Sequence, residues 1–257
     1  MGSEFEMSMM GELNFFLRLQ VKQTPRGTTI SQQKNIKELL TRFEMVSSKI
    51  IDTPIATATR PDMDEPGSPV NKTMYIGIIG SFLYLTTSRP DIVFSMGLCT
   101  RFQSNPKESH LKAAKIILRY LKGTQDLVLY YPSGDNFDLI GYADADYAGY
   151  LVDRKNISGM AHFLGSCMIS WDTRKQNSMA LSTAESEYVA VVSCCAQLLW
   201  IKKQQKILVY FLTVCPYYVI TPVLSTWQRI QFNIREQSTL MCDTTFSEIM
   251  LKMGLSV

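Results

Sequence analysis

The segment FDLIGYADADYAG, residues 137–149, decides what kind of fold this sequence can form. Its first part, Phe137–Tyr142, is rich in branched and aromatic residues and predicts a β-strand. Two more strands are predicted after it, at Gly159–Leu164 and Cys167–Trp171, and a long helix runs from Ser182 to about Lys203. Three consecutive strands followed by a helix predict an α+β sheet domain.

The chain ahead of this segment is predicted to be mainly helical, apart from a β-hairpin near its start. Leu13–Val21 and Thr28–Ile30 are the expected hairpin strands, with a turn at Pro25-Arg26-Gly27. Asp126–Tyr131 is expected to pair antiparallel with Phe137–Tyr142. Helices are predicted at Lys34–Phe43 with Ser31 as N-cap, at Met74–Phe102 with a break at Ser88–Asp91, and from Pro106 to Gly123 with Asn105 as N-cap.

Composition excludes several classes of protein. The 257 residues are 46% hydrophobic and 19% charged, which predicts one or two compact domains and excludes collagen and long coiled coils. A net charge of +3 is too small for a polycation, so nucleic-acid binding requires a local basic face. The 6 cysteines form no C-x-x-C pair and follow no secretory leader, which predicts free thiols in an intracellular compartment, cytoplasm or nucleus. With only His110 and His162, a histidine-based zinc site is nearly excluded.

Two aspartates stand at the end of the Phe137–Tyr142 strand. Asp144 and Asp146 are two residues apart, a spacing that puts both side chains on one face of a strand. Two carboxylates so close repel each other unless a cation or a base neutralises them. The pair therefore indicates either a metal site or a plain turn, where aspartate is common.

The predicted helix after Ser182 carries two glutamates with different duties. Ser182 and Glu185 match a capping box, in which the glutamate reaches back to the helix start. Glu187 has no such duty and is the better candidate for chemistry. A strand-end aspartate that faces a helix glutamate can hold magnesium for phosphodiester hydrolysis. The sequence therefore nominates Asp144 and Glu187 as catalytic, with Asp146 as a further metal ligand.

A basic stripe runs along the helix that ends at Gly123. Its apolar side is formed by Leu111, Ala114, Leu118 and Leu121. Such a stripe is most often a solvated face, and contact with phosphates is the alternative. Its members are Lys112, Lys115, Arg119 and Lys122.

Seven ordered runs closely resemble the C-terminal part of the pol polyprotein of plant copia-type retrotransposons. The resemblance covers roughly Ser3 to Gln204. The runs are GELNFFL (11–17), SRPDI (88–92), RFQSNP (101–106), RYLKGT (119–124), GYADADYAG (141–149), ISW (169–171) and LSTAESEY (181–188).

The resemblance implies the end of a reverse transcriptase followed by a ribonuclease H. The implied α+β fold is a helical thumb and connection region followed by an incomplete ribonuclease H-like mixed sheet with one long helix. By it, the hairpin with Phe16 and Gln20 is similar to a primer grip, and Asp144 and Glu187 match two ribonuclease H carboxylates. It also implies magnesium as cofactor and an RNA–DNA hybrid as partner, with no small-molecule substrate, and it favours hybrid contact by the basic stripe. The implied segments are the reverse transcriptase end with primer grip and thumb helix (1–51), a Pro-rich linker (52–73), connection-like helices (74–125), a truncated ribonuclease H-like domain (126–204) and a tail (205–257).

The sequence departs from the family pattern at both ends. The Tyr-Val-Asp-Asp strand that holds the polymerase metal would lie upstream of Met1, and Arg18 stands where the family has glycine in a tight turn. Beyond Gln204 the resemblance stops. Ile207–Gln228 is uncharged, which suggests a membrane helix, although prolines interrupt it.

A frameshift is the alternative explanation of the tail. Read one base out of phase, residues 216–221 allow Leu-Leu-Cys-Asp-Asn, the next family motif, which carries the third carboxylate. Residues 238–246 in the same phase allow a further family motif. We therefore expect a frameshift between about Gln204 and Pro216, and for that reason we do not expect the tail to insert into a membrane. The frameshift would leave the ribonuclease H metal site incomplete and a sheet edge uncovered.

Three hypotheses about activity follow. The first is an inactive remnant of a reverse transcriptase and ribonuclease H with residual nucleic-acid binding. The second is an active magnesium-dependent ribonuclease H that uses Asp144 and Glu187. The third is a chain without a selected role, or one attached to a membrane through its apolar tail.

Overall fold

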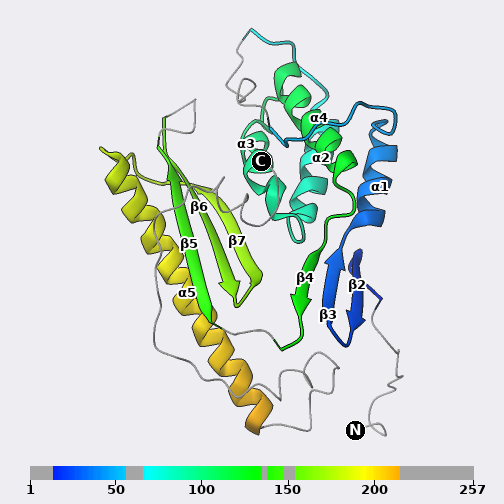
Figure 1. The fold of residues 1–257 in the computed structure, drawn as a ribbon. Coiled ribbons are helices and arrows are strands. Elements are labelled where there is room, and N and C mark those ends of the chain that lie inside the picture. The colour runs from blue at the N-terminus through cyan, green and yellow to red at the C-terminus, as the bar shows by residue number, and fades with distance from the viewer. Residues whose placement is uncertain (1–13, 56–65, 135–137, 148–153, 215–257) are drawn as a thin grey trace, which may run out of the picture.

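The computed structural model describes residues 14–55, 66–134, 138–147 and 154–214, and these form a mixed α+β fold with two antiparallel sheets (Figure 1). The predicted α+β class is confirmed, but the sheet that was expected to be mixed is antiparallel throughout its described strands. The tail beyond residue 214 lies outside the described residues, so its predicted membrane or frameshift character is a matter of sequence alone. No helix in the described ranges has the length and apolar character needed to cross a membrane.

The first sheet has the order β1-β2-β3-β4. Its strands are β1 (Phe15–Phe16), β2 (Leu19–Thr24), β3 (Gly27–Ser31) and β4 (Leu129–Pro132). The predicted hairpin is confirmed by the β2–β3 pairing, but the expected single strand Leu13–Val21 is split by a tight turn at Leu17 and Arg18.

The predicted pairing of Asp126–Tyr131 with Phe137–Tyr142 is wrong. β4 instead pairs with β3, over a register from Gly27↔Pro132 to Ile30↔Leu129. The absence of a side chain at Gly27 permits this close pairing, because a Cβ there would collide with the carbonyl oxygen of Tyr131. The segment that follows the helical region thus returns to the sheet at the start of the chain.

Four helices and a short 3₁₀ turn surround the main hydrophobic core. They are α1 (Gln33–Arg42), α2 (Lys72–Leu85), η2 (Pro90–Ile92), α3 (Val93–Thr100) and α4 (Glu108–Gly123). The predicted break near Ser88–Asp91 is confirmed by the short turn between α2 and α3. We call α1 to α4 the helical region; its core contains the fully buried side chains of Tyr75, Phe82 and Leu85.

Two predicted helix caps are wrong, for reasons of local pairing. Ser31 does not cap α1, because its backbone is held in the β2–β3 ladder opposite Gln20; Gln32 is the N-cap. Asn105 does not cap α4, whose N-cap is Lys107. The residues before α4 are held extended by backbone hydrogen bonds to residues 68–70, which delays the start of the helix to Glu108.

A buried ion pair ties the break after α2 to the end of α4. The Arg89 Nη2 lies 2.6 Å from Asp91 Oδ2, and both side chains are almost fully buried. The same guanidinium donates to the carbonyl oxygen and the hydroxyl of Thr124, at 2.9 and 2.6 Å. Each of the three Arg89 nitrogens therefore donates a hydrogen bond inside the protein, which offsets the cost of burying the charge.

The second sheet, order β5-β6-β7, is covered on one side by α5 (Figure 1). Its elements are β5 (Leu139–Asp146), β6 (Ile157–Leu164), β7 (Cys167–Lys175) and α5 (Thr183–Val214). The predicted strands, their turn at Gly165-Ser166 and the start of the long helix are confirmed. α5 continues beyond the expected end at about Lys203, so the first residues of the predicted tail are helical.

Candidate functional site

Asp144 and Glu187, the two predicted catalytic carboxylates, are neighbours across the contact of β5 with α5. Burial raises the pKa of Glu187, and the nearby charge of Asp144 raises it further. A hydrogen bond from the backbone of Ala145 to the Glu187 carboxyl opposes both effects. Asp144 lies in the β5–β6 ladder opposite Gly159, so a rigid strand and a long helix hold the pair.

The third predicted ligand, Asp146, is the last residue of β5. No group of three or more His, Cys, Asp or Glu side chains in the described ranges is arranged to hold a metal ion. Asp144 and Glu187 alone fit a magnesium ion only in part, because Mg²⁺ bound through two carboxylates needs water and substrate phosphates for its remaining positions.

Glu185 has the structural duty that its position in the sequence predicts. The Glu185 backbone N–H donates to Ser182 Oγ at 3.2 Å, and its carboxylate accepts from the backbone N–H of Leu181 at 2.7 Å. The predicted capping interaction is thus present, with the glutamate reaching one residue further back than expected. This leaves Glu187 as the glutamate available for chemistry.

The sequence did not single out the residues that set the spacing between α5 and β5. Gly141 faces α5, and Cys194 and His162 are fully buried beside it, with His162 Nε2 3.5 Å from Cys194 Sγ. The one signal for this contact was a glycine inside a predicted strand, which often marks a close approach of another element.

The hairpin that carries Phe16 and Gln20 presents apolar side chains to solvent. Phe16 is 52% exposed, and its neighbour Leu17 is 69% exposed. Leu17 and Arg18 both have positive φ, 46° and 63°, in the tight turn. Gln20 has a structural role as well, because its side-chain oxygen accepts from the backbone N–H of Lys34 at 2.9 Å and so caps α1.

Two residues of the basic stripe on α4 are exposed to solvent, and the other two form hydrogen bonds within the protein. Lys112 and Lys115 are exposed, and Lys112 forms an ion pair with Glu108 at 3.0 Å. Arg119 and Lys122 instead donate to the backbone carbonyls of residues 49 and 48, both at 2.6 Å. Arg119 and Lys122 tie α4 to the segment after α1, and the exposed lysines, Lys112 and Lys115, are at the start of the stripe.

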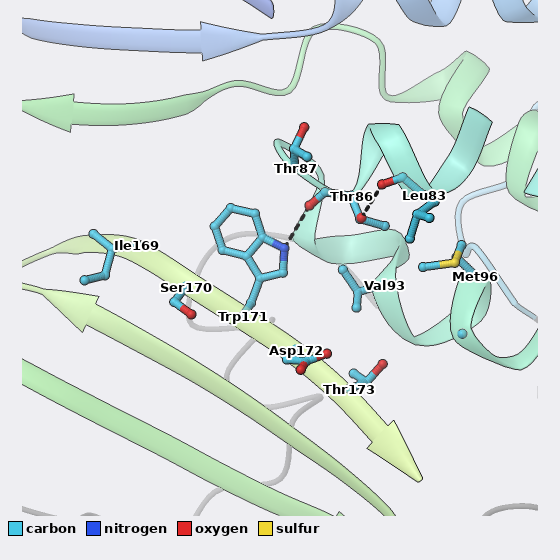
Figure 2. A pocket seen from close by; sticks show the side chains of 11 residues that line it. Leu83, Thr86, Thr87, Val93, Met96, Ile169, Ser170, Trp171, Asp172 and Thr173 are labelled. Carbon is cyan, nitrogen blue, oxygen red and sulfur yellow. Dashed lines mark hydrogen bonds between the residues drawn. The ribbon is translucent and has the colours of Figure 1, made fainter. Parts of the chain in front are cut away.

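A cleft of about 420 Å³ separates the helical region from the second sheet, and none of the predicted site residues lines it (Figure 2). Its walls are formed by α2 and α3 on one side and β7 on the other. Trp171 bridges the cleft, because its Nε1 donates to the carbonyl oxygen of Thr86 at 2.9 Å. No pattern in the sequence predicts this contact between the two regions.

Comparison with known proteins gives several relatives. The chain is 34% identical over 201 residues to the retrovirus-related Pol polyprotein from transposon RE1 of Arabidopsis thaliana, which is 78% of the chain and 14% of that protein. It is 34% identical over 212 residues to the Pol polyprotein from transposon TNT 1-94 of Nicotiana tabacum, 79% of the chain and 16% of that protein. An uncharacterized mitochondrial protein of Arabidopsis thaliana is 30% identical over 200 residues, and the match covers 83% of that protein.

No family model matches the chain, and no solved structure is similar to it. The chain spans about a seventh of the length of the two polyproteins. The matched length, 201 residues, is close to the extent predicted from the sequence runs. The chain therefore belongs to the family of retrovirus-related pol polyproteins of plant retrotransposons.

Proposed function

We propose that this chain is a remnant of a retrotransposon reverse transcriptase and ribonuclease H that still binds nucleic acid and does not hydrolyse it. The observation that carries the binding is a concentration of positive charge. Residues 14–55 and 66–125 contain 15 Lys and Arg against 5 Asp and Glu, whereas the whole chain has a net charge of only +3. A local excess of this kind attracts phosphates and displaces their counterions.

The exposed hairpin supports binding to a strand with accessible bases. Phe15 and Phe16 are 57% and 52% exposed, and the Lys34 ammonium lies 5.9 Å from the centre of the Phe15 ring. Aromatic rings beside basic side chains are the usual means of holding single-stranded segments, by stacking and by charge. We therefore assign the hairpin and the start of α4 as the parts that contact an RNA–DNA hybrid.

The proposed loss of hydrolysis rests on the carboxylates. Two bound metal ions would activate water and stabilise the leaving oxygen, and bridging carboxylates are needed to hold both. Asp144 and Glu187 would supply two of these ligands, while the family motif with the third is replaced after about Gln204 by a sequence that a frameshift explains. Two features of the described residues support this: β5 pairs only with β6 among the described strands, and α5 exposes Tyr188 and Leu199.

Binding is tested by the salt dependence of affinity for a short RNA–DNA hybrid. We expect Lys112→Gln with Lys115→Gln to lower the slope of log affinity against log salt by roughly 1 to 2, one unit for each lost phosphate contact. The control is Lys203→Gln with Lys206→Gln, on the exposed side of α5 across the molecule from α4 (Figure 1). No binding at low salt, or the same slope for both double variants, would overturn the proposal.

An active ribonuclease H is the second candidate, favoured by one observation. The Glu187 carboxyl is close enough to Asp144 for the aspartate charge to raise its pKa, which is the like-charge arrangement that a cation relieves. When bound, magnesium would supply the water activation that hydrolysis requires. Hydrolysis of the hybrid above the level of Asp144→Asn would favour this candidate over the remnant.

A further inference from the structure

The contact between α5 and β5 is closest at Gly141. A Cβ at this position would lie 2.7 Å from Leu198 Cδ1, 2.8 Å from Cys194 Sγ and 3.0 Å from Leu198 Cγ. Distances this short force a shift of the helix or of its side chains. Because glycine weakens a strand interior, the close approach of α5 is the physical reason for a glycine here.

Buried polar groups also hold α5 against β5 close to Gly141. Cys194 Sγ lies 3.6 Å from the carbonyl oxygen of Tyr142, and His162 Nε2 lies 3.4 Å from the carbonyl oxygen of Cys194. His162 is paired with Gly141 in the β5–β6 ladder, so it holds the strand and the helix at one point. We call Gly141, His162 and Cys194 the α5 seat.

The α5 seat and the carboxylate pair are in matching register. α5 runs antiparallel to β5, since Cys194 contacts Tyr142 whereas Glu187 accepts from the backbone of Ala145. From Cys194 back to Glu187 the helix advances about 10 Å. From Gly141 to Asp144 the strand advances about 10 Å in the same direction. Along the β5 axis the two carboxylates therefore lie at about the same distance from the seat, although Asp144 lies on the face of the strand opposite to Gly141.

We propose that the α5 seat positions Glu187 against Asp144, with Gly141 as a positioning residue that allows the helix to approach. This inference rests on the proposed function, because Asp144 and Glu187 are the carboxylates to which that function assigns the lost hydrolysis. A side chain at Gly141 would move the two rigid elements apart and separate the pair, although it touches neither carboxylate.

The test is a double-mutant cycle with Asp144→Asn and Glu187→Gln, read from unfolding equilibria at pH 8 and low salt. In the wild-type protein we expect the two charges to be coupled by roughly two- to fivefold in the unfolding constant, the range of exposed charge pairs. The coupling should be kept in Gly80→Ala, where a Cβ meets nothing within 4 Å, and lost in Gly141→Ala. Equal coupling in both glycine variants, or none in the wild-type protein, overturns the proposal.

Two more variants cover the case in which Gly141→Ala does not fold. Gly141→Ala with Leu198→Ala removes two of the three close contacts and should restore the coupling. Cys194→Ala removes the seat's thiol without adding volume and should weaken the coupling; retained coupling in Cys194→Ala contradicts the proposal. The cycle involves no nucleic acid, so a failure to bind hybrid would defeat the proposed function and leave this result intact.

Discussion

The helical region and the second sheet with α5 bury their apolar residues to different degrees. The core of the helical region joins 18 buried residues from α1 to α4 and the segments between them. The cluster between α5 and the second sheet contains 4, all but Met160 small. At the same time α5 exposes Tyr188, Val192 and Leu199 at 73%, 66% and 69%. Exposed apolar side chains of this size along one helix usually mark a surface that something else covers.

The difference teaches that the helical region is stabilised by its own internal contacts to a greater degree than the second sheet. The helical region is closed by its own contacts, including the buried Arg89 and the ties from α4 to the segment after α1. The second sheet has three strands in the described ranges, and β5 lies at an edge among them. We expect the helical region to be the more stable of the two.

The largest expected effect is in the helical region, at Arg89. Arg89→Ala leaves the buried carboxylate of Asp91 without its partner, and we expect a loss of about 3–5 kcal/mol in the free energy of unfolding. Denaturant titration followed by circular dichroism measures it. Arg174→Ala, which removes an exposed ion pair with Asp172, is the control and should cost less than about 1 kcal/mol. Similar losses of unfolding free energy for both variants would contradict the claim that the buried Arg89–Asp91 pair stabilises the helical region.

The next effect is an acid sensitivity of the second sheet. Burial lowers the pKa of His162, with a backbone hydrogen bond to Cys194 acting against it. The unfolded chain therefore binds a proton more readily, so stability is present at neutral pH and is lost as pH falls below the ordinary histidine pKa of about 6.5. Fluorescence of Trp171 and Trp200 should report this loss, and His162→Gln should flatten the dependence on pH. An unchanged pH dependence in the variant would refute the assignment.

A gain in stability is expected in the first sheet. Arg18 has a φ of 63°, which costs a residue with a side chain about 1 kcal/mol relative to glycine. Arg18→Gly should therefore stabilise the hairpin by about that amount, measured by thermal unfolding. Lys22→Gly, in the middle of β2, is the matched control and should destabilise. A stabilising effect of both changes would show that the turn geometry is not the cause.

The smallest effect is at the carboxylate pair. Because the pKa of Glu187 is raised in the folded protein, its charge opposes folding once the pH rises through that pKa. Glu187→Gln should thus increase stability at pH 7 by less than about 1 kcal/mol, and the gain should vanish near pH 4, where the unfolded glutamate is also protonated. Glu185→Gln weakens a helix cap and should not stabilise at either pH.

Local patterns in the sequence predicted much of the fold. The strands of the second sheet, the turn at Gly165-Ser166 and the capping role of Glu185 follow from residues close together in the chain. The misplaced caps of α1 and α4 and the pairing of β4 with β3 depend on contacts between distant segments, which periodicity does not contain. The same holds for the bond from Trp171 to Thr86 and for the α5 seat.

The sequence allowed the residues of the candidate site to be predicted, but their arrangement in space only in part. The spacing and the family resemblance predicted Asp144 and Glu187, and these lie together. Asp146 was predicted by the two-residue period of a strand, and it stays a prediction, because that period fixes a face of the strand and not a set of metal ligands. Arg119 and Lys122 were predicted as a binding surface from helical spacing, which does not reveal that each also donates one hydrogen bond to a nearby backbone carbonyl.

The most direct test of the remnant account is incubation of the wild-type chain with a labelled RNA–DNA hybrid in magnesium at low salt, with retention and cleavage measured on the same sample. The account predicts that the hybrid is retained and that cleavage does not exceed that of Asp144→Asn. Cleavage clearly above the level of Asp144→Asn, or no retention of the hybrid at all, would contradict it.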